Sequence, residues 1–369
     1  MSTVVVILLA LVVLSVLIVV HEFGHYISAR LFGVWVEEFG IGYPPKIKGK
    51  KIGETEYSIN ALPVGGFVRL HGETPGMEIS KPKRAFLNQS KFARIVISLA
   101  GVFMNFLLAI VFFTIIFWLT GVGRGVKIVE VVDGSPAHAS GLFIGDKVVS
   151  LDGKTLVDSQ DFPYYLEKHA GNLVNIGVER EVDGEHAAVV VPVNVRAEPK
   201  KNEGYVGAVY VPETLYEPPV WQRPFVYTKY GLQETYRWTD RIVVGLGTLF
   251  KQLLSGTASG GVAGPLGVTL TFAQAIKYGL VTTLNLAAII SINLALLNLI
   301  PFPPLDGSRV VLTLAELVVG AKIIRKHETR VYTVGMIILL LFVAVVTVGE
   351  IPKLIHAGSI SKFVESILQ

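Results

Sequence analysis

Two histidines and a glutamate stand at the end of a strongly apolar stretch near the start of this 369-residue chain. The segment VLSVLIVVHEFGHYISAR, residues 13–30, passes from aliphatic side chains directly into His-Glu-Phe-Gly-His. On a helix, His21 and His25 point the same way within about 40°, so both imidazoles can bind one metal ion. Glu22 can reach a water on that ion without being a ligand. The pattern predicts a zinc site at which the carboxylate takes a proton from water and passes it to a leaving amine.

The third ligand must come from elsewhere in the chain. A tetrahedral catalytic zinc takes three protein ligands and a water, and without any cysteine the third is His, Asp or Glu. Asp306 is the best candidate, because prolines 301, 303 and 304 end an apolar helix just before it. A broken helix at membrane depth is tolerated only where it is buried or lines a wet cavity. The alternative role for Asp306 is to cap a helix that begins near Ser308.

The composition places these residues in a membrane protein. The chain is 51% hydrophobic and 17% charged, and its mean hydropathy is +0.55, which excludes an ordinary soluble protein. Four apolar runs approach the ~20 residues needed to cross a bilayer: residues 4–20, 95–119, 281–299 and 331–348. Ionisable side chains inside such segments are functional by default, which favours the zinc site. The net charge of +4 is small and suggests no nucleic-acid partner.

The distribution of Lys and Arg predicts the orientation of the chain. These residues are concentrated between the first and second runs and between the third and fourth. The positive-inside rule therefore predicts that both connections are cytoplasmic. The N-terminus, residues 121–280 and the C-terminus are then outside, and the active site lies near the cytoplasmic side.

Residues 121–210 are expected to form a separate, mostly β domain. Strand-like runs alternate with turn signals at Asp133-Gly134, Asp152-Gly153 and Asp183-Gly184. The pattern SPA, GL, GDKV and DG across residues 135–153 resembles bacterial PDZ domains, which bind chain ends by adding a strand to a sheet edge. The resemblance implies a peptide-binding loop at Tyr205, Val206 and Gly207. The alternative is a β spacer that binds nothing.

Residues 211–279 follow as a third segment. Aromatic side chains interleave with Arg and Lys over residues 221–254, which is typical of helices at a membrane interface. A solvated helical linker is the alternative. The Gly-rich stretch 255–267 is expected to be a loop, and it lacks the Lys-Ser/Thr ending of a phosphate-binding loop.

The paired motifs resemble those of the site-2 protease family of intramembrane metalloproteases. HEFGH at 21–25 and NLIPFPPLDG at 298–307 carry the resemblance, with GGFVRLHGE at 65–73 and AGVFMN at 100–105 in the expected order. It covers nearly the whole chain and is nearest to the bacterial single-PDZ branch, of the RseP or RasP type. It implies one Zn²⁺ held by His21, His25 and Asp306, Glu22 as the base, and substrate contacts from Asn293 and Asn298. The alternative for both asparagines is hydrogen bonding between helices.

A candidate substrate-binding strand follows the first helix. Residues 57–70 are predicted to form two strands around Pro63 and Gly65-Gly66. An unwound helix in lipid has unpaired backbone groups, and a strand edge at Gly66, Phe67 and Val68 could pair with them. An ordinary cytoplasmic hairpin is the alternative.

The expected fold is therefore a polytopic α-helical membrane protein with four transmembrane helices and an inserted, mostly β, PDZ-like domain. Its parts are residues 1–120, 121–210, 211–279 and 280–369. The expected function is an intramembrane zinc endopeptidase of the bacterial inner membrane that cuts single-span proteins such as anti-sigma factors or signal-peptide remnants. Its other expected partners are the lipid bilayer and peptide ends at the PDZ-like domain. The alternatives are a metal or ion transporter and a catalytically dead PDZ scaffold.

Overall fold

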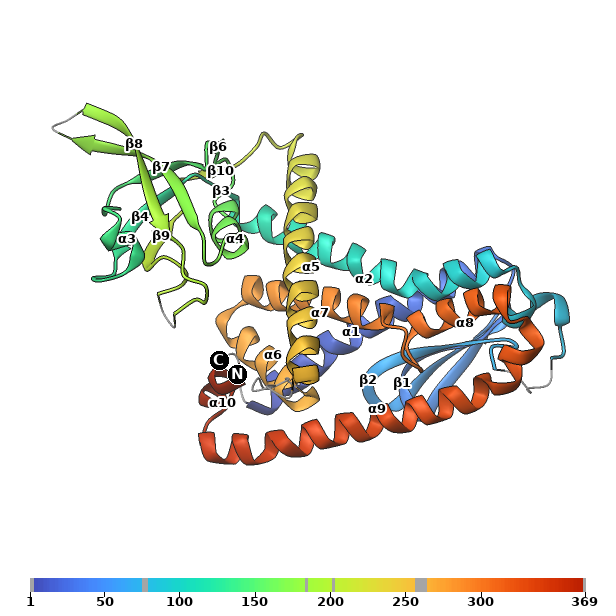
Figure 1. The fold of residues 1–369 in the computed structure, drawn as a ribbon. Helices are drawn as coiled ribbons and strands as arrows, with labels where there is room; N and C mark the ends of the chain where they lie inside the picture. Colours follow the sequence, from blue (N-terminus) through green and yellow to red (C-terminus); the bar gives the residue numbers. More distant parts are fainter. Residues whose placement is uncertain (1–2, 75–78, 183–184, 201–202, 256–263, 368–369) are drawn as a thin grey trace. The chain divides into compact units, whose positions relative to one another are not determined.

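The computed structural model describes residues 3–74, 79–182, 185–200, 203–255 and 264–367 (Figure 1). The chain divides into two compact units. The first contains Met1–Ile116 and Gly231–Gln369, and the second contains Phe117–Tyr230.

Four helices of the described chain are long and apolar enough to cross a membrane, which confirms the predicted number. They are α1 (Thr3–Leu31), α2 (Lys91–Thr120), α7 (Leu280–Leu299) and α9 (Ala321–Ala357). α1 and α9 extend furthest beyond their apolar runs. α1 continues through the histidine pair to Leu31, and α9 begins ahead of its run at Ala321, because a helix does not require apolar side chains and Arg, Lys and Glu are good helix formers.

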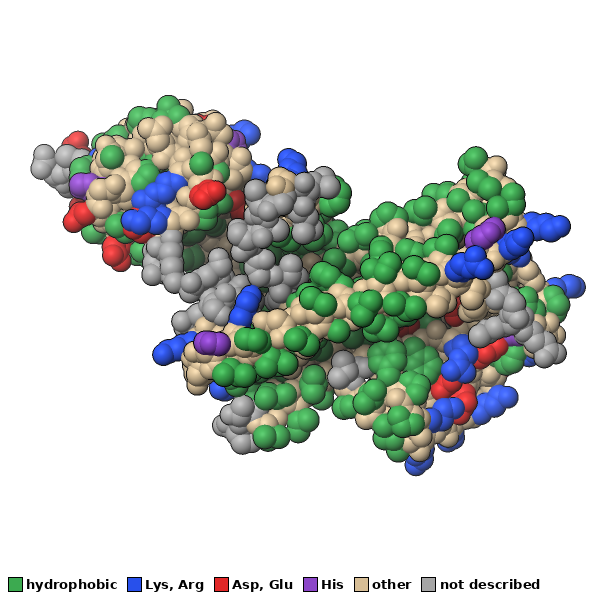
Figure 2. Space-filling model, turned by 60° about the horizontal axis from the view of Figure 1, so that its bottom comes forward, with side chains coloured by type: hydrophobic (Ala, Val, Ile, Leu, Met, Phe, Trp, Pro, Cys, Tyr) green, Lys and Arg blue, Asp and Glu red, His purple; other side chains and the backbone are tan. Residues whose placement is uncertain are grey.

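The surface of the first unit suits a bilayer. Leu340, Leu341 and Val345 on α9 are each at least 60% exposed. Figure 2 shows hydrophobic side chains covering the long helices, with charged side chains gathered at the end near β1 and β2. A soluble protein rarely exposes so large an apolar surface, so this face requires lipid.

A small antiparallel sheet lies next to α1 (Figure 1). It is formed by β1 (Val36–Ile52) and β2 (Thr55–Leu70). β2 folds back on itself, because Gly40 of β1 pairs with both Ser58 and Phe67. The first half of β1 therefore has one half of β2 on each side, in agreement with the two strands predicted around Pro63. Tyr26, Phe39 and Leu70 belong to the core that joins this sheet to α1. Two short helical turns, η1 (Pro82–Arg84) and η2 (Phe86–Asn88), lead on to α2.

α7 ends where the prolines begin. Its last residue is Leu299, and α8 (Asp306–Val318) starts after the break. A Cβ at Gly307 would lie 2.3 Å from the carbonyl oxygen of Leu299, so only glycine allows α8 to start this close to the end of α7.

The remaining helices of this unit pack around α1 and α9. α6 (Pro265–Tyr278) packs against α1 and α7, and α10 (Ile360–Ile367) packs against α6. Most of the Gly-rich stretch predicted as a loop, residues 256–263, lies outside the described residues, and Pro265–Gly267 already belong to α6. α5 (Arg223–Ser255) is a long helix whose residues from Gly231 onward belong to this unit.

The second unit contains a six-stranded sheet with the order β8-β7-β5-β4-β9, and β6 pairs with β5. Its buried core includes Ile128, Val148, Phe162 and Ile176. The turn predicted at Asp183-Gly184 lies outside the described residues, between the paired strands β7 and β8. The elements are β3 (Val122–Arg124), β4 (Val126–Val131), α3 (Pro136–Ala139), β5 (Lys147–Leu151), β6 (Lys154–Thr155), α4 (Asp161–Lys168), β7 (Leu173–Val182), β8 (Glu185–Asn194), β9 (Ala208–Val211) and β10 (Thr214–Tyr216).

Candidate metal centre

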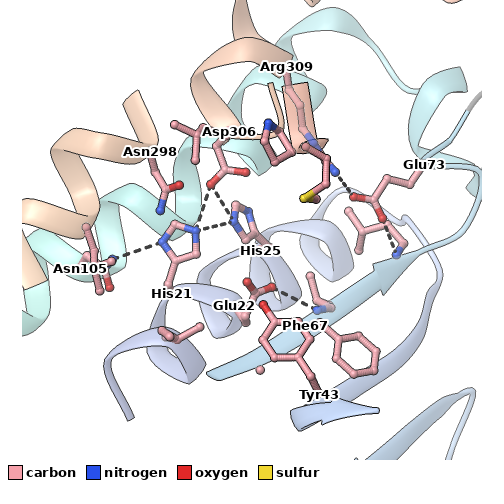
Figure 3. A pocket seen from close by; sticks show the side chains of 18 residues that line it. His21, Glu22, His25, Tyr43, Phe67, Glu73, Asn105, Asn298, Asp306 and Arg309 are labelled. Atoms are coloured by element: carbon pink, nitrogen blue, oxygen red, sulfur yellow. Dashed lines mark hydrogen bonds and ion pairs between the residues drawn. The ribbon is translucent and has the colours of Figure 1, made fainter. Parts of the chain in front are cut away.

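The two imidazoles of α1 meet the carboxylate of Asp306, although His21 and Asp306 are 285 positions apart in the sequence (Figure 3). The Nε2 atoms of His21 and His25 lie 3.1 Å apart. Asp306 Oδ2 lies 3.0 Å from the first and 3.2 Å from the second. Among the described residues, these three form the one group of His, Asp and Glu side chains that could hold a metal ion.

The three ligand atoms fit zinc. With bonds of about 2.0–2.1 Å, the ligand atoms of a tetrahedral zinc are about 3.3 Å from one another. The observed separations of 3.0–3.2 Å are close to this value. Three electron-pair donors at such distances repel one another unless a cation or a proton lies between them. Both histidines are buried, so a metal ion is the natural partner of the cluster.

The break between α7 and α8 supplies the third side chain. Leu305 occupies the N-cap position of α8, and no side chain caps the helix there. Asp306 is instead the first residue of α8, and its carboxylate faces the imidazoles. The capping role considered for Asp306 is therefore not observed.

One face of α2 packs behind the cluster of ligand atoms. His25 Nδ1 lies 2.8 Å from the carbonyl oxygen of Ile97, a contact in which only the imidazole can donate. This leaves the Nε2 lone pair of His25 for the metal. One turn further along, a Cβ on Gly101 would lie 2.5 Å from His25 Nε2 and 2.7 Å from His21 Nε2. Gly101 is thus what allows α2 to approach both rings.

Replacing Gly101 by Ala should weaken zinc binding by at least ~10-fold, because the new methyl group would collide with both imidazoles and displace them. Zinc affinity measured by chelator competition on the purified protein tests this. Gly247→Ala is a matched control, since Gly247 is also helical and nothing lies within 4 Å of its Cβ position. Equal zinc affinity in the two variants would contradict the expectation.

A cavity of about 480 Å³ opens beside the cluster. Glu22 lines it, and its Oε2 accepts a hydrogen bond of 3.1 Å from the backbone N–H of Val68 (Figure 3). Gly66, Phe67 and Val68 also line the cavity, as does Asn298. Asn293 lies on the same helix, half-buried, but does not line the cavity. The structure therefore brings together every residue predicted for the membrane site except Asn293.

Several side chains around the cavity were given no role by the sequence, among them Glu73, Arg309 and Tyr43. Glu73 and Arg309 form an ion pair that connects the end of β2 to α8. Tyr43 lies against Phe67, with ring centroids 6.4 Å apart. Burial and the negative charge of Glu22 raise the pKa of Tyr43 above its usual range, so its phenol remains protonated and able to donate. Glu73 ends the GGFVRLHGE motif, but nothing in the sequence assigned a role to it, to Arg309 or to Tyr43, and only the folded chain shows that they share one cavity.

A family model described as peptidase family M50 matches residues 9–342. The chain belongs to peptidase family M50. A relative from Clostridium perfringens, whose name classes it with the zinc metalloproteases, is 34% identical over 347 residues, which are 94% of this chain and 98% of that protein. The zinc metalloprotease RasP of Geobacillus kaustophilus is 28% identical over 421 residues, covering 93% of this chain and 97% of RasP.

Membership in family M50 agrees with the recognised site-2 protease motifs and with the enzyme class predicted from them. This M50 protein is a membrane-embedded zinc metalloprotease, and its cofactor is Zn²⁺. Peptide hydrolysis is its reaction, so neither a transporter nor a dead scaffold is needed to explain the cluster.

Proposed function

We propose that this M50 protein is an intramembrane endopeptidase that cuts the membrane-spanning segments of single-span proteins during regulated proteolysis. The observation that carries the proposal is the convergence of two imidazoles and a carboxylate within 3.2 Å, in a unit built from membrane-length helices. His21, His25 and Asp306 are proposed as the zinc ligands. Anti-sigma factors and signal-peptide remnants are substrates of the expected type.

Glu22 is proposed as the general base and acid. Zinc, when bound, supplies a Lewis acid that makes water acidic enough to be deprotonated near neutral pH. Glu22 is not a member of the ligand cluster, yet it lines the same cavity, so its carboxylate is available to take a proton from water. It would then deliver that proton to the leaving amine. The hydrogen bond from Val68 N–H holds the carboxylate on the cavity side of α1.

The last residues of β2 are proposed to receive the unwound substrate. Val68 N–H donates to Glu22, and Leu70 N–H donates to Glu73, so both groups point away from β1. Among the described residues no other strand pairs with this edge, and β1 pairs on the opposite side, as at Gly40 and Phe67. A substrate strand would have to exchange with the carboxylates of Glu22 and Glu73 for these two N–H groups. Strand pairing there would replace the hydrogen bonds that a substrate helix loses on unwinding.

Asn298 is proposed to hydrogen-bond the substrate backbone, since its amide lines the cavity on the side opposite β2. For Asn293 the same role stays a prediction. Its place on α7 outside the cavity lining favours the alternative of a contact between helices.

In the second unit, the outer edge of β9 is proposed to bind extended peptide ends in the manner of a PDZ domain. β9 is the last strand of its sheet and pairs with β4 on one side. The loop Tyr205-Val206-Gly207 leads directly into β9. Val206 is buried in the core and its carbonyl accepts the N–H of Ala137, so this loop is firmly held. This edge of β9 lies beside α4, because Phe162 of α4 packs on Tyr210 of β9. A spacer domain that binds nothing would not need an open strand edge next to a helix.

The proposed location is the bacterial inner membrane, with the zinc site near the cytoplasm. The Lys and Arg residues that predict this orientation include the exposed Lys48, Lys50 and Lys51 on β1. The N-terminus, the second unit and the C-terminus are then outside. α5 exposes Phe225, Leu232, Tyr236 and Phe250 along its length, which supports its proposed place at the membrane interface.

Cleavage within the bilayer can be tested with a single-span substrate reconstituted together with the full-length protein in liposomes. We expect mass spectrometry of the two products to place the cut inside the apolar segment, because the proposed ligands and base belong to membrane helices or directly follow one. Protein stripped of zinc by a chelator is the control and should give no products. Cuts confined to the aqueous parts of the substrate would refute the proposal.

A further inference from the structure

α2 presents three residues at four-residue spacing to the histidines of α1. Ile97 offers its carbonyl oxygen to His25, and Gly101 leaves room for both rings. Asn105, the next residue on this face, lies with its amide Nδ2 3.3 Å from His21 Nδ1 (Figure 3). Residues at this spacing share one side of a helix, so a single face of α2 reaches the outer nitrogens of both imidazoles.

The chemistry of His21 requires an acceptor at this place. Its Nε2 faces Asp306 and His25, and it can bind a metal only if the single proton of the neutral ring is on Nδ1. A buried ring N–H without an acceptor is costly, and ligating histidines usually donate to a carboxylate or a carbonyl. His25 meets this need through Ile97, whereas the group at His21 Nδ1 is the Asn105 amide.

Asn105 can supply that acceptor. Its side chain is completely buried, and its Oδ1 has no hydrogen-bond partner among the described residues. A half-turn of the amide exchanges Oδ1 and Nδ2, which occupy nearly equivalent positions, and brings Oδ1 to His21 Nδ1. The backbone is held in place, because Ser291 Oγ on α7 donates a hydrogen bond of 2.8 Å to the Asn105 carbonyl oxygen.

We propose that Asn105 is a positioning residue of the zinc site: its Oδ1 accepts the Nδ1 proton of His21 and so fixes both the tautomer and the orientation of that ring. The inference rests on the ligand roles proposed above. α2 then provides the acceptor for the Nδ1 proton of each histidine: the backbone carbonyl of Ile97 for His25, and the side chain of Asn105 for His21.

Zinc affinity of the purified full-length protein, measured by chelator competition, tests the proposal without any substrate. Asn105→Leu keeps the approximate volume but removes the acceptor, and it should bind zinc about 10- to 100-fold more weakly. Asn105→Asp can only accept, and it should bind zinc at least as tightly as the parent, because a carboxylate is the better acceptor. Thr114→Ala removes another polar side chain of α2, one that bonds its own helix at Ile110 and lies more than two turns beyond Asn105, and its zinc affinity should remain that of the parent.

Two results would overturn the proposal. One is an Asn105→Leu variant that binds zinc as tightly as the parent, and the other is an Asn105→Asp variant as weak as the Leu variant. If the Leu variant lacks a cooperative unfolding transition, Asn105→Ala replaces it, since Ala also lacks the acceptor. His21→Ala, measured in parallel, tests the ligand assignment separately from the role of Asn105. If this variant binds zinc as tightly as the parent, His21 is not a ligand. If it loses zinc, His21 is a ligand, and the Asn105 variants alone decide the role of Asn105.

Discussion

Replacing Glu22 by Gln should lower the rate of peptide cleavage by at least ~10²-fold and leave zinc binding unchanged. Gln has nearly the same shape and can still occupy the cavity, but it cannot take a proton from water or return one to the leaving amine. Glu22 is not one of the three side chains whose ligand atoms cluster, so the metal site keeps its full set of donors. Cleavage of a single-span substrate and metal content, measured on the same preparation, test both halves of the expectation.

A Gln variant that cuts at the parental rate would exclude Glu22 as the base. A variant that loses zinc together with activity would show that Glu22 belongs to the ligand set. Glu54→Gln serves as the matched control, because Glu54 is an exposed carboxylate that pairs with Arg84 at a distance from the cavity. Its activity should equal that of the parent.

Replacing Asp306 by Ala should remove zinc and activity together, with zinc affinity lowered by at least ~10²-fold. The change leaves two imidazoles and no third protein donor among the clustered atoms. Metal analysis after dialysis against zinc-free buffer, combined with the cleavage assay, measures both effects.

Zinc and activity could also be lost if the Ala substitution prevented the first turn of α8 from folding. Asp306 is the first residue of α8 and makes no capping hydrogen bond, so the Ala variant should retain its helix content by circular dichroism. Full zinc occupancy in a folded Asp306→Ala protein would refute its role as a ligand and require the third donor to lie elsewhere.

Several features of this protein follow from the sequence because they depend on local geometry. The helical period places His21 and His25 on one side of α1 whatever the rest of the chain does. Hydropathy identifies the membrane helices, since length and side-chain transfer energy are properties of each segment alone. Proline at 301 ends α7 because it cannot donate a backbone hydrogen bond.

The boundaries of the helices were less well predicted. α1 and α9 extend beyond their apolar runs, since hydropathy detects the part in lipid and the helix continues into polar residues. The role suggested for Asn293 stays a prediction, and it too depends on more than the local sequence. A motif indicates that an asparagine matters, but which side of α7 faces the cavity depends on how that helix packs.

The sequence by itself determined which residue types could bind a metal ion, how many apolar helices are long enough to span a membrane, and where the chain breaks before Asp306. Only the tertiary structure decided that this break meets α1, that Gly101 and Asn105 form the back of the site, and that Val68 N–H reaches Glu22. The physical reason is the range of the interactions. Helical periodicity and hydropathy act over a few neighbouring residues, whereas a distance between side chains 285 positions apart is set by the packing of whole helices, which no local pattern specifies.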